Sequence, residues 1–367
     1  MKRNSLSKNG VTVKPKAELL QNGQNTAFIV GKSVPENHIL ELALLNNQEG
    51  AHMEAYILEH FRKTGTFTYA GSYKDYFRSL PDDIAVLGRL ICSQVIHRVT
   101  LKDGNTNANA NLLYGDMNQY PWYRMRCEDD VLLTAPALTA ELFRMDERGF
   151  VKDRKVENKI VVTCRYVSVL MSAILKAKGI PARSRAGFAP YFNEGVSMDH
   201  WINQYYNEKE RRWVTFDADG FYEEGGMPLS QYDMPADSFD WAADAYLAVR
   251  RGETDGRQYL YADGLGTCSL PALVRYLIYD FHALMNHELT YSFIPAYLDG
   301  RLDRLAEEEL QELDRLAEWM LEPDRHFDKL CALWEQERKF RILNSPLVGA
   351  YDHGAELEAA VWIGSKP

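Results

Sequence analysis

Apolar side chains recur at helical spacing in the segment "VVTCRYVSVLMSAILKAKGIPARSRAGF", residues 161–188. Positions three and four apart along a helix share one face, so this pattern predicts a helix with a single buried side. Thr163 is a suitable N-cap, and Gly179 followed by Pro181 predicts the end of the helix, after which a strand begins. The residues of the predicted apolar face are Val167, Leu170, Met171, Ile174 and Leu175.

A second pattern, "DHWINQYYNEKERRWVTFDAD" at residues 199–219, has two arms rich in aromatic and β-branched residues around a polar centre. Such a pattern predicts a β-hairpin. A turn at this centre sets Gln204 opposite Trp213 and His200 opposite Asp217. Directly opposed side chains have Cβ atoms roughly 4.5–5.5 Å apart, so this register predicts an imidazole held by a carboxylate. A polar cross-strand pair at a sheet edge is the alternative interpretation.

Helical spacing recurs on both sides of these two segments. Helices, then one helix feeding a small antiparallel sheet, then more helices, form an order that predicts an α+β fold rather than an alternating βαβ one. The predicted elements are helices over 36–63 (broken near Gly50), 82–98, 137–145, 272–288, 302–321 and 325–341, strands over 199–206 and 211–217, and a loop over 104–123.

Changes in composition predict three regions along the chain. We expect a flexible polar tail over residues 1–30, a core with its N-terminal helices over 31–225, and a mostly helical extension over 226–367.

Charge and hydropathy exclude several functional classes. The 367 residues carry a formal net charge of −10, whereas general nucleic-acid binding needs a basic face. No stretch approaches the ~18 consecutive apolar residues of a membrane span, and no apolar run follows the basic N-terminal residues. We therefore expect a cytoplasmic protein that binds neither nucleic acid nor membrane.

The cysteines do not form a recognisable framework. Five of them are scattered along the chain without a CxxC pair, which predicts neither disulfides nor a zinc site. Nucleotide-binding glycine motifs and calcium loops are also absent, so we expect no metal and no cofactor. The cysteines are Cys92, Cys127, Cys164, Cys268 and Cys331.

Cys164 differs from the other four because it falls in the first turn of the predicted helix. Free backbone N–H groups and the helix dipole at this end favour a thiolate and can receive an oxyanion. Packing, metal ligation and nucleophilic catalysis are the three alternatives, and an inward cysteine without a partner is most often a core residue.

The chain resembles the transglutaminase-like superfamily in these segments. The resemblance extends over residues 155–220 and depends on three blocks that follow Cys164 at its helix start. They are "AKGIPARSRAGF" (177–188), "DHWINQYY" (199–206) and "RRWVTFDAD" (211–219), in the family's order. It implies a papain-like fold with a Cys-His-Asp triad.

The resemblance also implies a role for each matched residue. Cys164 corresponds to the nucleophile, His200 to the general base and acid, and Asp217 to the residue that orients the imidazole. Asp219 is the alternative for the third role, and the predicted register favours Asp217.

Two positions depart from the family's pattern. Val162 stands where many members have a glycine, which changes the environment of an oxyanion, and Ala218 stands where a proline often follows the aspartate. Residues 128–142 and the helical tail resemble bacterial stand-alone proteins of the superfamily.

The implied reaction is acyl transfer through a thioester, from an amide to an amine as in transglutaminases. Two alternatives are a cysteine protease or amidase that uses water, and a non-catalytic scaffold. The expected partners are protein, peptide or small amide and amine substrates, and the sequence does not determine the oligomeric state. The amide of Cys164 is the expected oxyanion donor, with Trp122 or Tyr123 as a candidate second donor.

Overall fold

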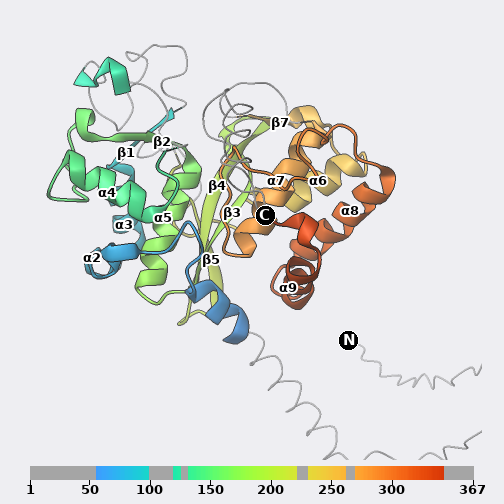
Figure 1. Cartoon of the computed structure of the whole chain (residues 1–367), viewed down its shortest axis with the longest axis horizontal. Helices are drawn as coiled ribbons and strands as arrows, with labels where there is room; N and C mark the ends of the chain where they lie inside the picture. The colour runs from blue at the N-terminus through green and yellow to red at the C-terminus, as the bar shows by residue number, and fades with distance from the viewer. Residues whose placement is uncertain (1–54, 99–118, 125–130, 221–229, 262–268, 343–367) are drawn as a thin grey trace, which may run out of the picture. The chain divides into compact units, whose positions relative to one another are not determined.

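The protein has an α+β fold in which helices pack on both faces of a central sheet (Figure 1). The predicted tail over 1–30 and most of the predicted helix over 36–63 lie outside the described residues. The computed structural model describes residues 55–98, 119–124, 131–220, 230–261 and 269–342.

Two sheets organise the described residues. The larger sheet has the order β5-β4-β3-β6 with antiparallel neighbours, and a further strand, β7, pairs with β4 in parallel. In the smaller sheet, β1 (Val95–His97) pairs with β2 (Ile160–Val162) in parallel. The strands of the larger sheet are β3 (Ala182–Asn193), β4 (Val196–Asn207), β5 (Arg212–Phe216), β6 (Asp240–Trp241) and β7 (Tyr259–Leu260).

Helices between residues 74 and 177 pack on one face of this sheet, and helices after the hairpin, joined by the helix over 55–62, pack on the other (Figure 1). The first group shares an apolar cluster with α5 and β5, and the second shares one with β3 and β4. The helices are 55–62, α2 (Lys74–Ser79), α3 (Ile84–Cys92), α4 (Ala135–Met145), α5 (Cys164–Ala177), α6 (Ala242–Arg250), α7 (Leu270–Leu284), α8 (Glu307–Leu321) and α9 (Phe327–Gln336); short 3₁₀ turns are η1 (Gly71–Tyr73), η5 (Trp122–Arg124), η6 (Val156–Asn158), η7 (Gly256–Gln258) and η8 (Arg338–Phe340).

The predicted helix over the cysteine segment is confirmed as α5, and Gly179 ends it with a left-handed φ of 81°. The sequence indicated one buried face, but every residue of α5 is buried. Its serine side chains are satisfied against the sheet, because Ser172 Oγ lies 3.0 Å from Ser184 Oγ and Ser168 Oγ donates to the Ile202 carbonyl at 3.1 Å. These bonds fix the position of α5 over β3 and β4.

Buried charges join the C-terminal half to the core. The Arg185 guanidinium on β3 donates to both carboxylate oxygens of Asp280 on α7, each at 2.8 Å. On α5, Arg165 Nε donates to the Leu289 carbonyl at 2.8 Å, and Lys176 Nζ donates to Asn286 Oδ1 at 2.6 Å. Residues after 225 therefore contact the cysteine helix and the strand next to it. The domain boundary at 225 stays a prediction.

The predicted hairpin forms, but its predicted register is wrong. Gln204 pairs with Thr215 instead of Trp213. The Asn207 side chain accepts hydrogen bonds from the backbone N–H groups of Lys209 and Glu210, and these bonds centre the turn one residue later than expected.

The prediction of a helix over 82–98 is also wrong at its end. Helix α3 stops at Cys92, and the Gln94 side chain donates to the Leu90 and Val151 carbonyls at 2.6 and 2.7 Å. The next three residues form β1 instead, so His97 lies beside the strand that leads into Cys164.

No helix in the described part of the chain has the length and apolar character needed to cross a bilayer.

Candidate active site

Cys164 is the first residue of α5, and Thr163 alone separates it from the end of β2. Its side chain is buried, and it belongs to the apolar cluster shared by β3, β4 and α7. The Tyr291 hydroxyl lies 3.5 Å from the sulfur. The sulfur therefore lies at the helix end whose first backbone N–H groups have no partner within the helix.

His200 and Asp217 form a buried hydrogen-bonded pair. His200 lies on β4, and Asp217 follows the last residue of β5. His200 Nε2 lies 2.9 Å from Asp217 Oδ2. In the observed register the two residues are diagonal rather than opposed, a separation that an imidazole can still bridge.

Three further contacts hold Asp217 in place. The Tyr191 hydroxyl donates to Asp217 Oδ2 at 2.8 Å, and the Asp219 backbone N–H donates to Oδ1 at 3.0 Å. The Asp217 backbone N–H donates to the Gln231 carbonyl at 3.0 Å. A carboxylate with this many fixed donors is a rigid acceptor for the imidazole.

The charges around His200 favour an imidazolium. Burial lowers the pKa of His200, but the charges of Asp217 and Cys164 and the hydrogen bond that the ring donates to Asp217 outweigh this effect and raise the pKa well above its ordinary value. Nε2 faces Asp217, so the other ring nitrogen is the one that does not face this carboxylate. The structure thus places a hydrogen-bonded His200–Asp217 pair close enough to Cys164 for its charge to act on the imidazole.

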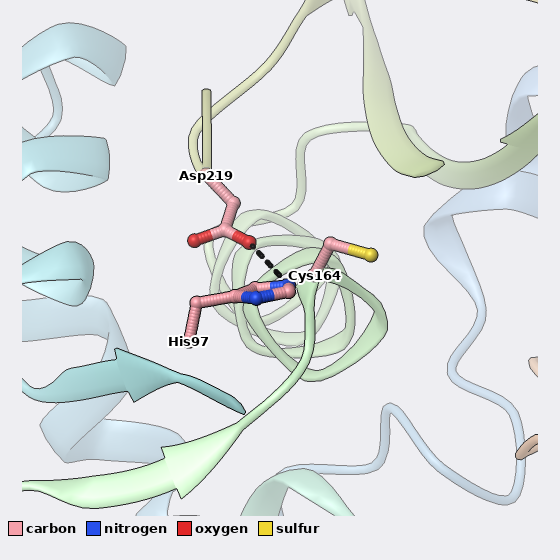
Figure 2. Close-up of side chains that lie close together, drawn as sticks. All are labelled: His97, Cys164 and Asp219. Atoms are coloured by element: carbon pink, nitrogen blue, oxygen red, sulfur yellow. Dashed lines mark ion pairs between the residues drawn. The ribbon is translucent and has the colours of Figure 1, made fainter. Parts of the chain in front are cut away.

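A second His–Asp pair also lies near the cysteine. His97 at the end of β1 and Asp219 beyond β5 are both buried, with His97 Nε2 3.6 Å from Asp219 Oδ2 (Figure 2). Burial, helped by the charges of His200 and Arg98, lowers the pKa of His97 to about 3. Burial raises the pKa of Asp219 to about 8, with His200 opposing and Asp217 adding to the shift. This pair is therefore uncharged at neutral pH.

Cys164, His97 and Asp219 also form a set of donors that suits a metal ion. One ligand atom from each lies within 4.8 Å of the other two. A thiolate, an imidazole and a carboxylate with one open position match the ligand types of catalytic zinc sites. Sequence spacing did not predict this set because its members lie on three separate segments of the chain.

The structure gives no support to the two predicted upstream oxyanion donors. Trp122 and Tyr123 lie on η5 and are 82% and 66% exposed, whereas the cysteine sulfur is buried. His97 and Tyr291 were not predicted from the sequence. The β-branched run before His97 was the available indication of a strand; no motif marked Tyr291.

Comparisons with known proteins place part of the chain in a family. Residues 150–218 match the model of the transglutaminase-like superfamily. No curated protein matches the chain. One solved structure, from Cytophaga hutchinsonii and provisionally described as a cysteine protease, is 18% identical over 46% of this chain; the match spans half of that structure's length. Its TM-score of 0.17 is too low to support an argument about fold or function.

Proposed function

Because residues 150–218 belong to the transglutaminase-like superfamily, we propose that this protein catalyses acyl transfer through a thioester on Cys164. The observation that supports this function is the buried, hydrogen-bonded His200–Asp217 pair, whose imidazole is near enough to Cys164 for the two charges to interact. A nucleophile, a base within hydrogen-bond reach and a residue that orients the base are the three parts that covalent acyl transfer requires.

In the proposed reaction, the Cys164 thiolate attacks the carbonyl carbon of an amide. The C=O electrons move to oxygen, and the tetrahedral intermediate collapses as His200 donates its proton to the departing amine. The resulting thioester is then cleaved by an acceptor, which loses a proton to His200. Asp217 keeps the imidazole oriented and stabilises its positive charge in both steps.

We propose an amine as the preferred acceptor, as in transglutaminases. Support comes from the burial of the sulfur among aromatic side chains, since Tyr291 contacts it and Trp201 packs in the same cluster beside Tyr279. An apolar environment disfavours water as the competing nucleophile. Hydrolysis by a protease or amidase uses the same triad and is the second outcome that the test distinguishes.

The first test measures the alkylation of each cysteine by iodoacetamide at pH 6.5, followed by mass mapping. Cys164 should react fastest, and His200→Ala should slow it about 100-fold because the imidazolium no longer stabilises the thiolate. Cys331 is the internal control, since burial and nearby carboxylates raise its pKa. Reaction of Cys164 at the rate of Cys331 would contradict catalysis and favour a non-catalytic scaffold.

The second test separates transfer from hydrolysis. The protein is incubated with a blocked glutaminyl-glycine peptide and a fluorescent primary amine, and both amine incorporation and ammonia release are measured. Incorporation that accounts for most of the released ammonia supports transfer. Ammonia release without incorporation assigns an amidase, and Cys164→Ala should abolish either reaction.

A further inference from the structure

Three polar side chains meet in the core at the far end of the cysteine helix. Lys176 lies near the end of α5, and Asn286 and Glu288 follow α7. The side chains of Lys176 and Glu288 are fully buried, and Asn286 is 9% exposed. Twelve helical residues, a rise of about 18 Å, separate Lys176 from Cys164, so this cluster is distinct from the candidate active site.

The amine of Lys176 lies against the side-chain amide of Asn286. Nζ is 2.6 Å from Oδ1, and the amide carbon is one C=O bond, about 1.2 Å, beyond this oxygen. Nζ and the amide carbon are therefore at most about 3.8 Å apart, close to the separation of about 3–3.5 Å from which held groups react. The amide is fixed on its other side, because Nδ2 donates to the His60 carbonyl at 2.7 Å.

Glu288 stands beside this pair, and its geometry is not that of a stabilising ion pair. Its Oε1 atom is 4.0 Å from Lys176 Nζ, which is too long for a hydrogen bond. Neither carboxyl oxygen has a hydrogen-bond partner among the described residues. A buried ion pair offsets its desolvation only when such bonds are made, so the position of Glu288 needs another explanation. Transfer of a proton between the amine and the amide is a role that this position allows.

Attack by the amine requires its neutral form. Burial lowers the pKa of Lys176 to about 8, although the charge of Glu288 opposes this shift. At neutral pH about a tenth of the lysine side chains are therefore uncharged and carry a free lone pair. The reaction occurs once per molecule, so this fraction, replenished as it is consumed, is sufficient over the lifetime of the folded protein.

We propose that Lys176 and Asn286 form an intramolecular isopeptide bond in the folded protein, with Glu288 as the proton carrier. The Nζ–Cγ bond forms as the amine attacks the amide carbon, and the Cγ–Nδ2 bond breaks. Glu288 takes the proton that Nζ loses and gives it to Nδ2, which leaves as ammonia. The bond joins the cysteine helix covalently to the C-terminal part of the chain, and its formation does not depend on the proposed acyl transfer.

Peptide mapping of the purified protein under denaturing conditions tests for the bond. Trypsin does not cleave after an acylated lysine, so the bond yields one branched peptide in which residues 166–178 are joined to residues 276–301. This peptide should be lighter than its two arms together by one ammonia molecule, and the intact protein should be lighter by the same mass. Separate linear peptides over 166–176 and 276–301 would overturn the proposal, and the cluster would then be a buried hydrogen bond alone.

Three variants test the route by which the bond forms. Glu288→Gln keeps the size of the side chain but cannot carry the proton, and it should lower the branched fraction at least about tenfold. Asn286→Asp should form the same bond with loss of water instead of ammonia. Cys164→Ala should form it to the same extent as wild type, because the reaction does not use the active site.

Each result with these variants bears on one part of the proposal. Equal branching in wild type and Glu288→Gln overturns the role of Glu288. Loss of the branched peptide in Cys164→Ala overturns the self-catalysed route, since the bond would then be a product of the proposed transferase. The wild-type map decides whether the bond exists, whether or not each variant folds, and circular dichroism reports the folding of each one.

Discussion

Two His–Asp pairs lie near one cysteine, and they differ in distance and in charge. His200 and Asp217 are hydrogen-bonded at 2.9 Å, and the neighbouring charges raise the pKa of the imidazole. His97 and Asp219 are 3.6 Å apart, and burial lowers the pKa of His97 while it raises that of Asp219. The same two residue types thus give a charged pair and a neutral pair in neighbouring positions.

The difference shows that local donors decide the state of a buried carboxyl group. Asp217 receives hydrogen bonds from Tyr191 and from the Asp219 backbone in addition to His200. Asp219 Oδ2 has no donor among the described residues. An ionised carboxylate needs such donors when it is buried. The pair of His200 and Asp217 therefore suits an imidazolium, whereas the pair of His97 and Asp219 stays uncharged.

The largest expected effect comes from replacing each acid in turn by its amide. Asp217→Asn should slow alkylation of Cys164 at pH 6.5 about 10- to 100-fold, because His200 loses the carboxylate that keeps it protonated. Asp219→Asn, the matched control, should change the rate less than about threefold, since Asp219 is already uncharged at this pH. Equal losses in the two variants would remove the distinction between the pairs.

Binding of a soft metal ion should distinguish the pair of His97 and Asp219 from the pair of His200 and Asp217. We expect Cd²⁺ to bind Cys164 together with His97 and Asp219, to block alkylation, and to show thiolate charge-transfer absorption. A chelator should restore alkylation. Asp219→Asn should weaken Cd²⁺ binding at least about tenfold. Unchanged affinity in this variant would show that the ion uses other ligands.

The smallest effect concerns stability at alkaline pH. Because burial raises the folded-state pKa of Asp219 to about 8, the folded state holds a proton that the unfolded state has released, and stability falls as pH rises through 8. Between pH 7 and pH 9 we expect wild type to lose about 1.4 kcal/mol relative to Asp219→Asn in urea unfolding. The lysines whose pKa burial lowers to about 8, Lys159 and Lys176, are present in both proteins and cancel. Parallel curves for the two proteins would contradict a neutral Asp219.

The sequence predicted the parts of the fold that local rules determine. The α+β class and the superfamily are confirmed. Helix α5 begins at Cys164 and ends before Gly179, because apolar spacing and glycine geometry both act within a few residues. The structure places His200 beside Asp217 as the sequence predicted. The predicted strand register was wrong, but the imidazole reaches Asp217 diagonally across the two strands.

The second pair could not be found in this way. His97 is 67 positions before Cys164 in the chain, and it reaches the site only through the parallel pairing of β1 with β2. A parallel pairing depends on contacts between distant segments, which leave no local pattern. Tyr291 likewise meets the sulfur through tertiary packing alone.

The anchoring of Arg165 has a consequence for how the protein is made. Its guanidinium donates to carbonyl groups of Glu288 and Leu289, which are 123 and 124 positions further along the chain. During synthesis Cys164 leaves the ribosome long before these acceptors do. Until they emerge, the guanidinium of Arg165 cannot be buried against them. Nascent chains should therefore stay inert until the C-terminal third has emerged.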